Sequence, residues 1–165
     1  MAKTITTSPG GLADAGVRSA LSKLQTASCD FVMQAAGLAL KTTSSPLAKS
    51  ANTIKAFIDG VVVTKAAADM AALAGTIATA KKGIFVFTLA ADGTLATRAG
   101  SLTAATLAAL TYPTIPAGEV IIGFIIVENA TGSDFVGGTT ALDTASLTVT
   151  YVDTPFPWNP NAVTL

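Results

Sequence analysis

The chain has 165 residues, of which half are hydrophobic and only 12% are charged, and its formal net charge is zero. Binding to nucleic acid needs many cations facing phosphates, and no basic block exists beyond the pair Lys81–Lys82, so we expect no nucleic-acid partner. The densest apolar run, Val120–Val127, is far shorter than the roughly 20 residues that cross a bilayer, so we expect no membrane segment.

The low charge predicts an unusual surface. Ordinary soluble domains carry about twice this charged fraction, so the surface must consist largely of Ala, Thr, Ser and Gly, or neighbouring subunits must cover it. We interpret the composition as that of an assembly subunit, with an alanine-rich monomer as the alternative. Cys29 is the single cysteine, and residues 1–16 contain no apolar h-region. We therefore expect a protein without a signal peptide that folds in a reducing cytoplasm.

The N-terminal segment predicts an arm followed by a short helix. Residues 1–11 are rich in Thr, Ser and Gly, which favours a flexible arm. A helix is predicted over Ala13–Thr26, where Asp14 lies in the first turn and suits the helix dipole. This helix could pack on the core or on a neighbouring subunit. Its apolar stripe consists of Leu12, Val17, Leu21 and Leu24.

Two hairpins are predicted in the middle of the chain. The pairs Asp59-Gly60 and Asp92-Gly93 favour tight turns, because both central positions of such a turn need positive φ. Apolar runs enriched in β-forming residues flank each pair. Earlier strands and a Pro-containing break precede them. The predicted segments are strand regions 31–33 and 37–40, a break at 42–46, and hairpin arms 53–58, 61–64, 83–90 and 94–97.

The segments between the strands are less regular. The alanine-rich stretch Ala66–Ala74 predicts a helical turn or a loop, and Thr103–Leu110 has helical composition. Tyr112–Gly118 contains two prolines and a glycine, which predicts a stiff connector. Loops are expected at Asn129–Ser133 and Gly137–Thr140.

Val120–Val127 gives the clearest strand pattern. Strict alternation places Val120, Ile122, Phe124 and Ile126 on one face and Ile121, Gly123, Ile125 and Val127 on the other. Both faces are apolar, so the strand is buried on both sides. Either it lies at the centre of a sandwich, or a partner chain covers one face. Ser146–Val152 alternates and predicts a last strand.

The end of the chain predicts an extended arm with aromatic anchors. Residues 153–165 contain three prolines around Phe156 and Trp158, and such a segment cannot be a central strand. Aromatic side chains dominate the energetics of interfaces. A disordered tail is the alternative.

These patterns predict a mainly β fold with about seven or eight short strands, a compact β-sandwich or barrel of the jelly-roll kind. We expect three parts: an N-terminal arm with a short helix over residues 1–29, a β-domain over residues 30–152, and a C-terminal arm over residues 153–165.

The sequence offers little catalytic chemistry. It contains no histidine, which removes Ser-His-Asp and Cys-His catalysis and the commonest metal ligand. No activating base is evident for Cys29, so we expect a small core residue there. The carboxylates are scattered, although two of them could meet in space as in a glycosidase. Asn129-Ala130-Thr131 matches a glycosylation sequon that we interpret as a β-turn. We therefore predict no enzymatic activity, no cofactor and no metal.

Four fragments between Phe57 and Val152 form a recognisable order along the chain: Phe57-Ile58-Asp59-Gly60, Ala91-Asp92-Gly93-Thr94, Tyr112 to Val127, and Asp134 to Asp143. In this order they resemble a loose class of tailed-phage virion structural proteins. The resemblance does not cover residues 1–56 or the proline-rich end.

The resemblance implies a non-enzymatic capsid decoration (cement) protein or head-fibre protein, which is β-rich and homo-oligomeric. The expected partners are the major capsid protein and other copies of the chain, as a trimer. The expected location is the exterior of the capsid, after synthesis in the host cytoplasm. A head-fibre or tail-fibre component contacting the host surface is the alternative, with Tyr112 and Phe135 as loop aromatics. From the residue patterns we expect the arms to bind partners through Phe156, Trp158, Leu12, Val17 and Leu21.

Overall fold

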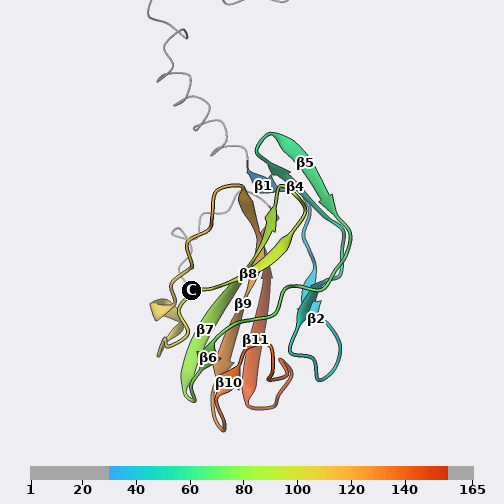
Figure 1. The fold of residues 1–165 in the computed structure, drawn as a ribbon. Helices are drawn as coiled ribbons and strands as arrows, with labels where there is room; N and C mark the ends of the chain where they lie inside the picture. The colour runs from blue at the N-terminus through green and yellow to red at the C-terminus, as the bar shows by residue number, and fades with distance from the viewer. Residues whose placement is uncertain (1–29, 156–165) are drawn as a thin grey trace, which may run out of the picture.

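The computed structural model describes residues 30–155 (Figure 1). The predicted N-terminal helix, Cys29, and the predicted anchors Phe156 and Trp158 lie outside this range. The described chain is mainly β, with antiparallel sheets and one short 3-10 turn, η1, at Leu107–Ala109. The strands are β1 (Phe31–Val32), β2 (Leu38–Leu40), β3 (Ala48–Ser50), β4 (Ile54–Ile58), β5 (Val61–Lys65), β6 (Thr76–Ile77), β7 (Lys81–Ala90), β8 (Leu95–Ala99), β9 (Glu119–Asn129), β10 (Phe135–Val136) and β11 (Leu147–Asp153).

A four-stranded antiparallel sheet with the order β11-β9-β7-β8 forms the centre of the domain. A three-stranded sheet, β1-β4-β5, and two small sheets, β2-β3 and β6-β10, surround it. Figure 1 shows β1, β4 and β5 at one end and β6 and β10 at the other. No closed barrel forms among the described strands, because β11 and β8 are the two edges of the central sheet.

Both predicted hairpins are confirmed, and so is the reason for the first turn. Asp59 has φ 50° and Gly60 has φ 82°, so both central residues adopt the left-handed conformation that the β4–β5 turn requires. In the β7–β8 turn Gly93 has φ 83°, and the Asp92 carboxylate accepts a hydrogen bond from the backbone N–H of Thr94 at 2.8 Å. These turns are locally encoded, since the residues that need positive φ are the ones that tolerate it.

The first face of the central sheet packs against the smaller sheets. Val32 of β1, Ala56 of β4 and Val63 of β5 are buried in register, with exposed fractions of 1%, 0% and 8%. They meet Phe85 and Ile125, which are paired residues of β7 and β9. This is the larger of the two apolar clusters, and it forms the main core.

The second face of the central sheet is covered by the chain itself. The connection from β8 to β9, residues 100–118, lays Ala104, Leu110 and Tyr112 against Val86 and Phe124. The rings of Tyr112 and Phe124 meet edge to face, with centroids 5.6 Å apart. The two-sided burial predicted for β9 is confirmed, and no partner chain is needed to cover these residues.

The predicted helical character of Thr103–Leu110 is wrong beyond the single turn η1. The segment lies on a sheet and packs Ala104, Leu107 and Leu110 against it. Tertiary packing outweighs the weak helical propensity of its alanines and leucines. The stretch Ala66–Ala74 runs as a loop, one of its two predicted forms, and it buries Met70 and Leu73 in the main core.

The predicted faces of β9 are wrong at one point. A register shift after Phe87 pairs Phe87 with Gly123 and Thr88 with Ile121, so Ile122 has no cross-strand partner in β7. This bulge reverses the alternation. Ile122 therefore lies in the same cluster as Ile125, whereas strict alternation had placed them on opposite faces.

Candidate functional site

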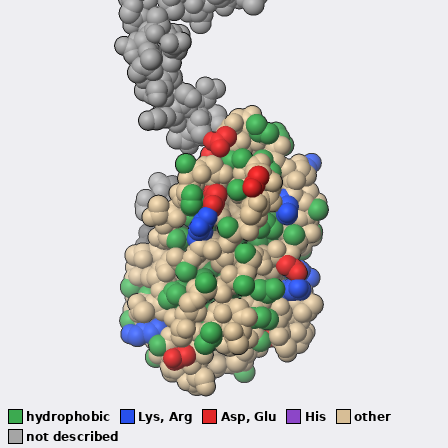
Figure 2. Space-filling model, viewed as in Figure 1, with side chains coloured by type: hydrophobic (Ala, Val, Ile, Leu, Met, Phe, Trp, Pro, Cys, Tyr) green, Lys and Arg blue, Asp and Glu red, His purple; other side chains and the backbone are tan. Residues whose placement is uncertain are grey.

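The described residues offer three places where function could reside: an exposed apolar sheet face, a shallow pocket and a partly buried ion pair. Charged side chains are sparse on the face of the domain shown in Figure 2. Within residues 30–155 no group of three or more His, Cys, Asp or Glu side chains could hold a metal ion. In the same range no helix has the length and apolar character needed to cross a bilayer.

The exposed apolar face belongs to the sheet β1-β4-β5. Phe31, Phe57 and Val62 are in register across its three strands. Their sequence neighbours Val32 and Ala56 point into the core, and alternate residues of a strand point to opposite faces. The three side chains therefore point outward. With Met33, which follows β1, they form what we call the outer face.

Exposure of the outer face is substantial. Met33 is 50% exposed and Val62 is 55% exposed. Phe31 and Phe57 stack on each other, with ring centroids 5.8 Å apart and planes at 28°. Val61, at the start of β5, is also 61% exposed, although alternation directs it to the opposite face from Val62. Exposed apolar side chains gathered as on the outer face are a feature by which protein–protein contact sites are recognised.

The edge of the same sheet is also open. β5 pairs with β4 and with no other described strand, so one side of its backbone offers unpaired N–H and C=O groups. Natural edge strands are usually protected by charges, prolines or bulges. The sequence of β5, VVVTK, carries one lysine at its end. The outer face and this edge adjoin each other, since β5 belongs to both.

The amino-acid sequence of β5 carries a signal for this surface, which the hairpin prediction did not take into account. Val61, Val62 and Val63 are consecutive in one strand. Alternation allows a strand to bury at most every second residue in a one-sided sheet, so a run of three valines must direct apolar side chains away from the core.

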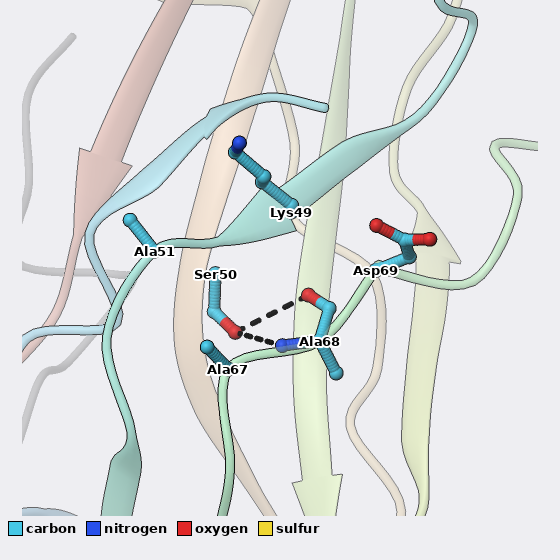
Figure 3. A pocket seen from close by; sticks show the side chains of 6 residues that line it. All are labelled: Lys49, Ser50, Ala51, Ala67, Ala68 and Asp69. Atoms are coloured by element: carbon cyan, nitrogen blue, oxygen red, sulfur yellow. Dashed lines mark hydrogen bonds between the residues drawn. The ribbon is translucent and has the colours of Figure 1, made fainter. Parts of the chain in front are cut away.

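The pocket lies between β3 and the loop after β5 (Figure 3). Its volume is about 310 Å³, and it is lined by Lys49, Ser50, Ala51, Ala67, Ala68 and Asp69. The Ser50 hydroxyl accepts a hydrogen bond from the Ala68 N–H at 3.0 Å and donates one to the Ala68 carbonyl at 3.2 Å. The Asp69 carboxylate pairs with Lys41 at 2.6 Å. The hydroxyl thus holds two chain segments together, and we assign no reaction to this pocket.

The ion pair joins three strands of the central sheet. Arg98 of β8 donates through Nε to Glu119 Oε2 at 3.2 Å and through Nη2 to Oε1, and the Thr88 hydroxyl donates to Oε2 at 2.7 Å. Burial raises the pKa of the Glu119 carboxyl. The hydrogen bonds from Arg98 and Thr88, with the charge of Arg98, lower that pKa more, so it lies below the usual 4.5. An acid held ionised in this way fits a structural clamp.

This clamp predicts a pH dependence of stability. A carboxyl whose pKa is lower in the folded than in the unfolded state stabilises the fold above the unfolded pKa, and this contribution is lost as pH falls through the folded pKa. We expect Glu119→Gln to cost about 1.5 kcal/mol at pH 7 and less as pH falls below about 4.5. Urea unfolding of both proteins between pH 3 and pH 7 measures the difference. A gap that stays constant over this range would contradict the clamp.

The sequon residue Asn129 is buried at the end of β9, with 1% exposure, and not in the predicted β-turn. Its Nδ2 donates to the carbonyl oxygens of Ile77 and Ser133, both at 3.1 Å. The amide that glycosylation would modify is therefore occupied in the folded domain. The residue joins β9 to β6 and to the turn that follows β9.

The aromatic residues expected in loops are not free for recognition. Phe135 lies in β10 and is fully buried against Phe85, with ring centroids 6.2 Å apart. Tyr112 packs on Phe124, and burial raises the pKa of its hydroxyl. The predicted anchors Phe156, Trp158, Leu12, Val17 and Leu21 lie outside the described residues, so they stay predictions.

The position from which the C-terminal residues depart is fixed by the fold. Thr154, 4% exposed, follows β11, and its hydroxyl donates to the Ile121 carbonyl at 2.9 Å. The Asp153 carboxylate accepts a hydrogen bond from the Leu38 N–H at 3.2 Å. The last described residues are therefore held against both β9 and β2.

No family model matches the chain, and no curated protein or solved structure shows significant similarity to it.

Proposed function

We propose that this chain is a non-enzymatic capsid decoration (cement) protein of a tailed phage, which binds the assembled head lattice and stabilises it. The observation that carries the proposal is the outer face, an exposed apolar surface at one end of a domain whose two core clusters are otherwise closed. The resemblance of residues 57–152 to phage virion proteins and the weakly charged surface support the same role.

The mechanism of stabilisation is mass action. A protein that binds only the assembled lattice stabilises that lattice by its binding free energy, and many copies add their contributions. The partners are the major capsid protein and other copies of the chain, as a homotrimer. The location is the capsid exterior. We also propose that the layers on the two sides of the main core form a sandwich of the jelly-roll kind.

A head-fibre or tail-fibre component is the second candidate from the sequence. A receptor-binding role would draw on exposed loop aromatics, and the two candidates for it, Tyr112 and Phe135, are packed inside the domain. No described residue favours this alternative, and stoichiometry separates it from decoration.

The copy number of the protein in purified virus particles tests the proposal. It is measured as a gel-band ratio to the major capsid protein. A ratio near one, or a simple fraction of one, supports decoration of the whole lattice. A few copies per particle would indicate a fibre or tail component, and absence from the particle would refute a virion role and reopen the question of an enzyme.

The C-terminal anchors yield a separate prediction. The double variant Phe156→Ala/Trp158→Ala is expected to fold normally but to bind capsids at least tenfold more weakly, because aromatic anchors carry much of the energy of an interface. Co-sedimentation with capsids lacking the protein measures the affinity. The matched control is Val136→Ala, which truncates an exposed apolar side chain of β10. If the double variant bound like the parent, the arm would not be an anchor.

A further inference from the structure

We infer that in the free subunit the outer face is covered by the N-terminal segment of the same chain, residues 13–24, docked as an amphipathic helix. The juxtaposition of three features carries this inference: where the segment joins the domain, the apolar stripe it offers, and the charges at the two ends of the outer face. The inference concerns the free subunit and does not depend on the proposed capsid role. Only the final statement, on displacement of the segment during capsid binding, rests on that role.

The first feature is position. The chain enters the described domain at Asp30, directly before β1, and β1 carries Phe31 of the outer face. A linker from residue 24 to residue 30 can reach about 20 Å. The outer strands of a three-stranded sheet lie about 10 Å apart. The segment can therefore turn back over the face that it adjoins. So short a tether gives an effective concentration on the order of millimolar.

The second feature is the apolar stripe. Val17, Leu21 and Leu24 are spaced i, i+4 and i+7, which places them on one side of a helix. The outer face offers exposed side chains of matching character, Met33 and Val62, with the stacked rings of Phe31 and Phe57 between the strands. A helix covering a sheet in this way completes a two-layer packing.

The third feature is charge. Asp30 and Asp59 lie together at the hairpin end of the sheet, where the Asp59 N–H donates to the Asp30 carboxylate at 2.9 Å. Figure 2 shows acidic side chains gathered at the end of the domain that carries this hairpin. Lys55 is exposed on the same face near the other end of β4. The hairpin end of the sheet is thus acidic, and the outer face carries a cation near the other end.

The N-terminal segment carries the opposite pattern. Lys23 lies at its C-terminal end, Arg18 lies in its middle and Asp14 lies near its start. A segment that turns back from residue 30 brings Lys23 to the acidic end and Asp14 to Lys55. The lengths agree as well: Asp14 to Lys23 spans about 14 Å of helix, and Lys55 to the hairpin turn spans about 13 Å of strand.

Cysteine cross-linking in dilute solution tests the docking. In a Cys29→Ser background, Leu21→Cys is combined with Val62→Cys on the outer face. Under a mild oxidant we expect an intramolecular disulfide, seen as a mobility shift of the monomer on a non-reducing gel, to form at least tenfold faster than in the control. The control pairs Leu21→Cys with Thr144→Cys, an exposed position in the loop between β10 and β11.

Exchanging charges tests the proposed orientation of the segment on the outer face, which places Asp14 near Lys55. Asp14→Lys alone, or Lys55→Glu alone, is expected to slow cross-linking severalfold, and the two together are expected to restore it. Equal rates for the Val62 and Thr144 pairs would overturn the docking. Disulfides mainly between two chains would overturn it also, since they would show that a second copy supplies the segment. If the docking holds, capsid binding through the outer face must first displace the segment.

Discussion

Replacing Phe124 with alanine is expected to lower the free energy of unfolding by about 4 kcal/mol, the largest loss that we predict for a single truncation. Phe124 is 2% exposed and lies in β9 at the centre of the second face. Its ring meets that of Tyr112 edge to face. The truncation removes both the buried ring and the main surface on which residues 100–118 rest.

The size of this loss follows from what covers the second face. The covering segment has one backbone bridge to β7, between Ala104 and Lys82, and otherwise only the turn η1 as regular structure. Apolar contacts such as those with Ile84 and Val86 therefore supply much of what holds it. Among the described strands, no second sheet lies over this face that could move inward and fill a cavity at Phe124. Large-to-small substitutions cost most where the surrounding structure cannot relax into the cavity.

Urea unfolding at neutral pH measures the effect of Phe124→Ala. Phe124→Leu keeps most of the volume and is expected to cost under about 1.5 kcal/mol. Val136→Ala, at an exposed position of β10, is expected to stay within about 0.5 kcal/mol of the parent. A loss below about 1 kcal/mol for Phe124→Ala would mean that the covering segment is held elsewhere.

The second large effect is expected at Asn129. In Asn129→Asp, a buried carboxylate would face the carbonyl oxygens of Ile77 and Ser133, which now accept hydrogen bonds from the side-chain amide. We expect the free energy of unfolding to fall by about 3 kcal/mol at pH 7. The buried carboxylate has no partner of opposite charge, and the two carbonyl oxygens lose their hydrogen-bond donor.

This loss should depend on pH with a defined sign. Burial beside two carbonyl oxygens raises the pKa of the new carboxyl above its unfolded value of about 3.9. The penalty is therefore smallest below about pH 4, where the carboxyl is protonated in both states, and it grows as pH rises toward the folded pKa. Unfolding free energies of variant and parent, compared at each pH, give the difference.

Asn52→Asp provides the matched control, because the Asn52 amide also donates to a backbone carbonyl, that of Ala35, but at an exposed site. We expect it to cost under about 1 kcal/mol. Equal losses of stability at both positions, or a loss at Asn129 that does not change with pH, would show that burial of the Asn129 side chain does not determine its contribution to stability.

Features encoded within a few residues could be predicted from the sequence. The turns at Asp59-Gly60 and Asp92-Gly93 contain the residues that positive φ demands, and the hairpins followed from them. The double burial of β9 followed from its unbroken apolar run. In each case the deciding information lies in neighbouring residues.

Features decided by distant partners could not be predicted. β6 and β10 are two-residue strands that exist because Ile77 pairs with Phe135 across a long stretch of chain. The bulge at Ile122 depends on how β9 meets β7, and Gly123 is its one local sign, since a glycine inside a strand often marks a bulge. The outer face is predictable only in part: the valine run of β5 indicates an outward apolar side chain, but the residues of the face come from three strands that meet only in the fold.

The cover on the second face also constrains the order of folding. Residues 100–118 separate β8 from β9 in the chain, yet β7 and β9 are hydrogen-bonded neighbours. Pairing of β7 with β9 closes a long loop, and such non-local topologies fold slowly, in milliseconds to seconds. Until that loop settles, a half-formed sheet shows apolar surface on both sides and is prone to aggregate. When many copies are synthesised rapidly in one cell, aggregation of partly folded chains would therefore limit the yield of folded protein. Lowering the growth temperature should raise the soluble yield.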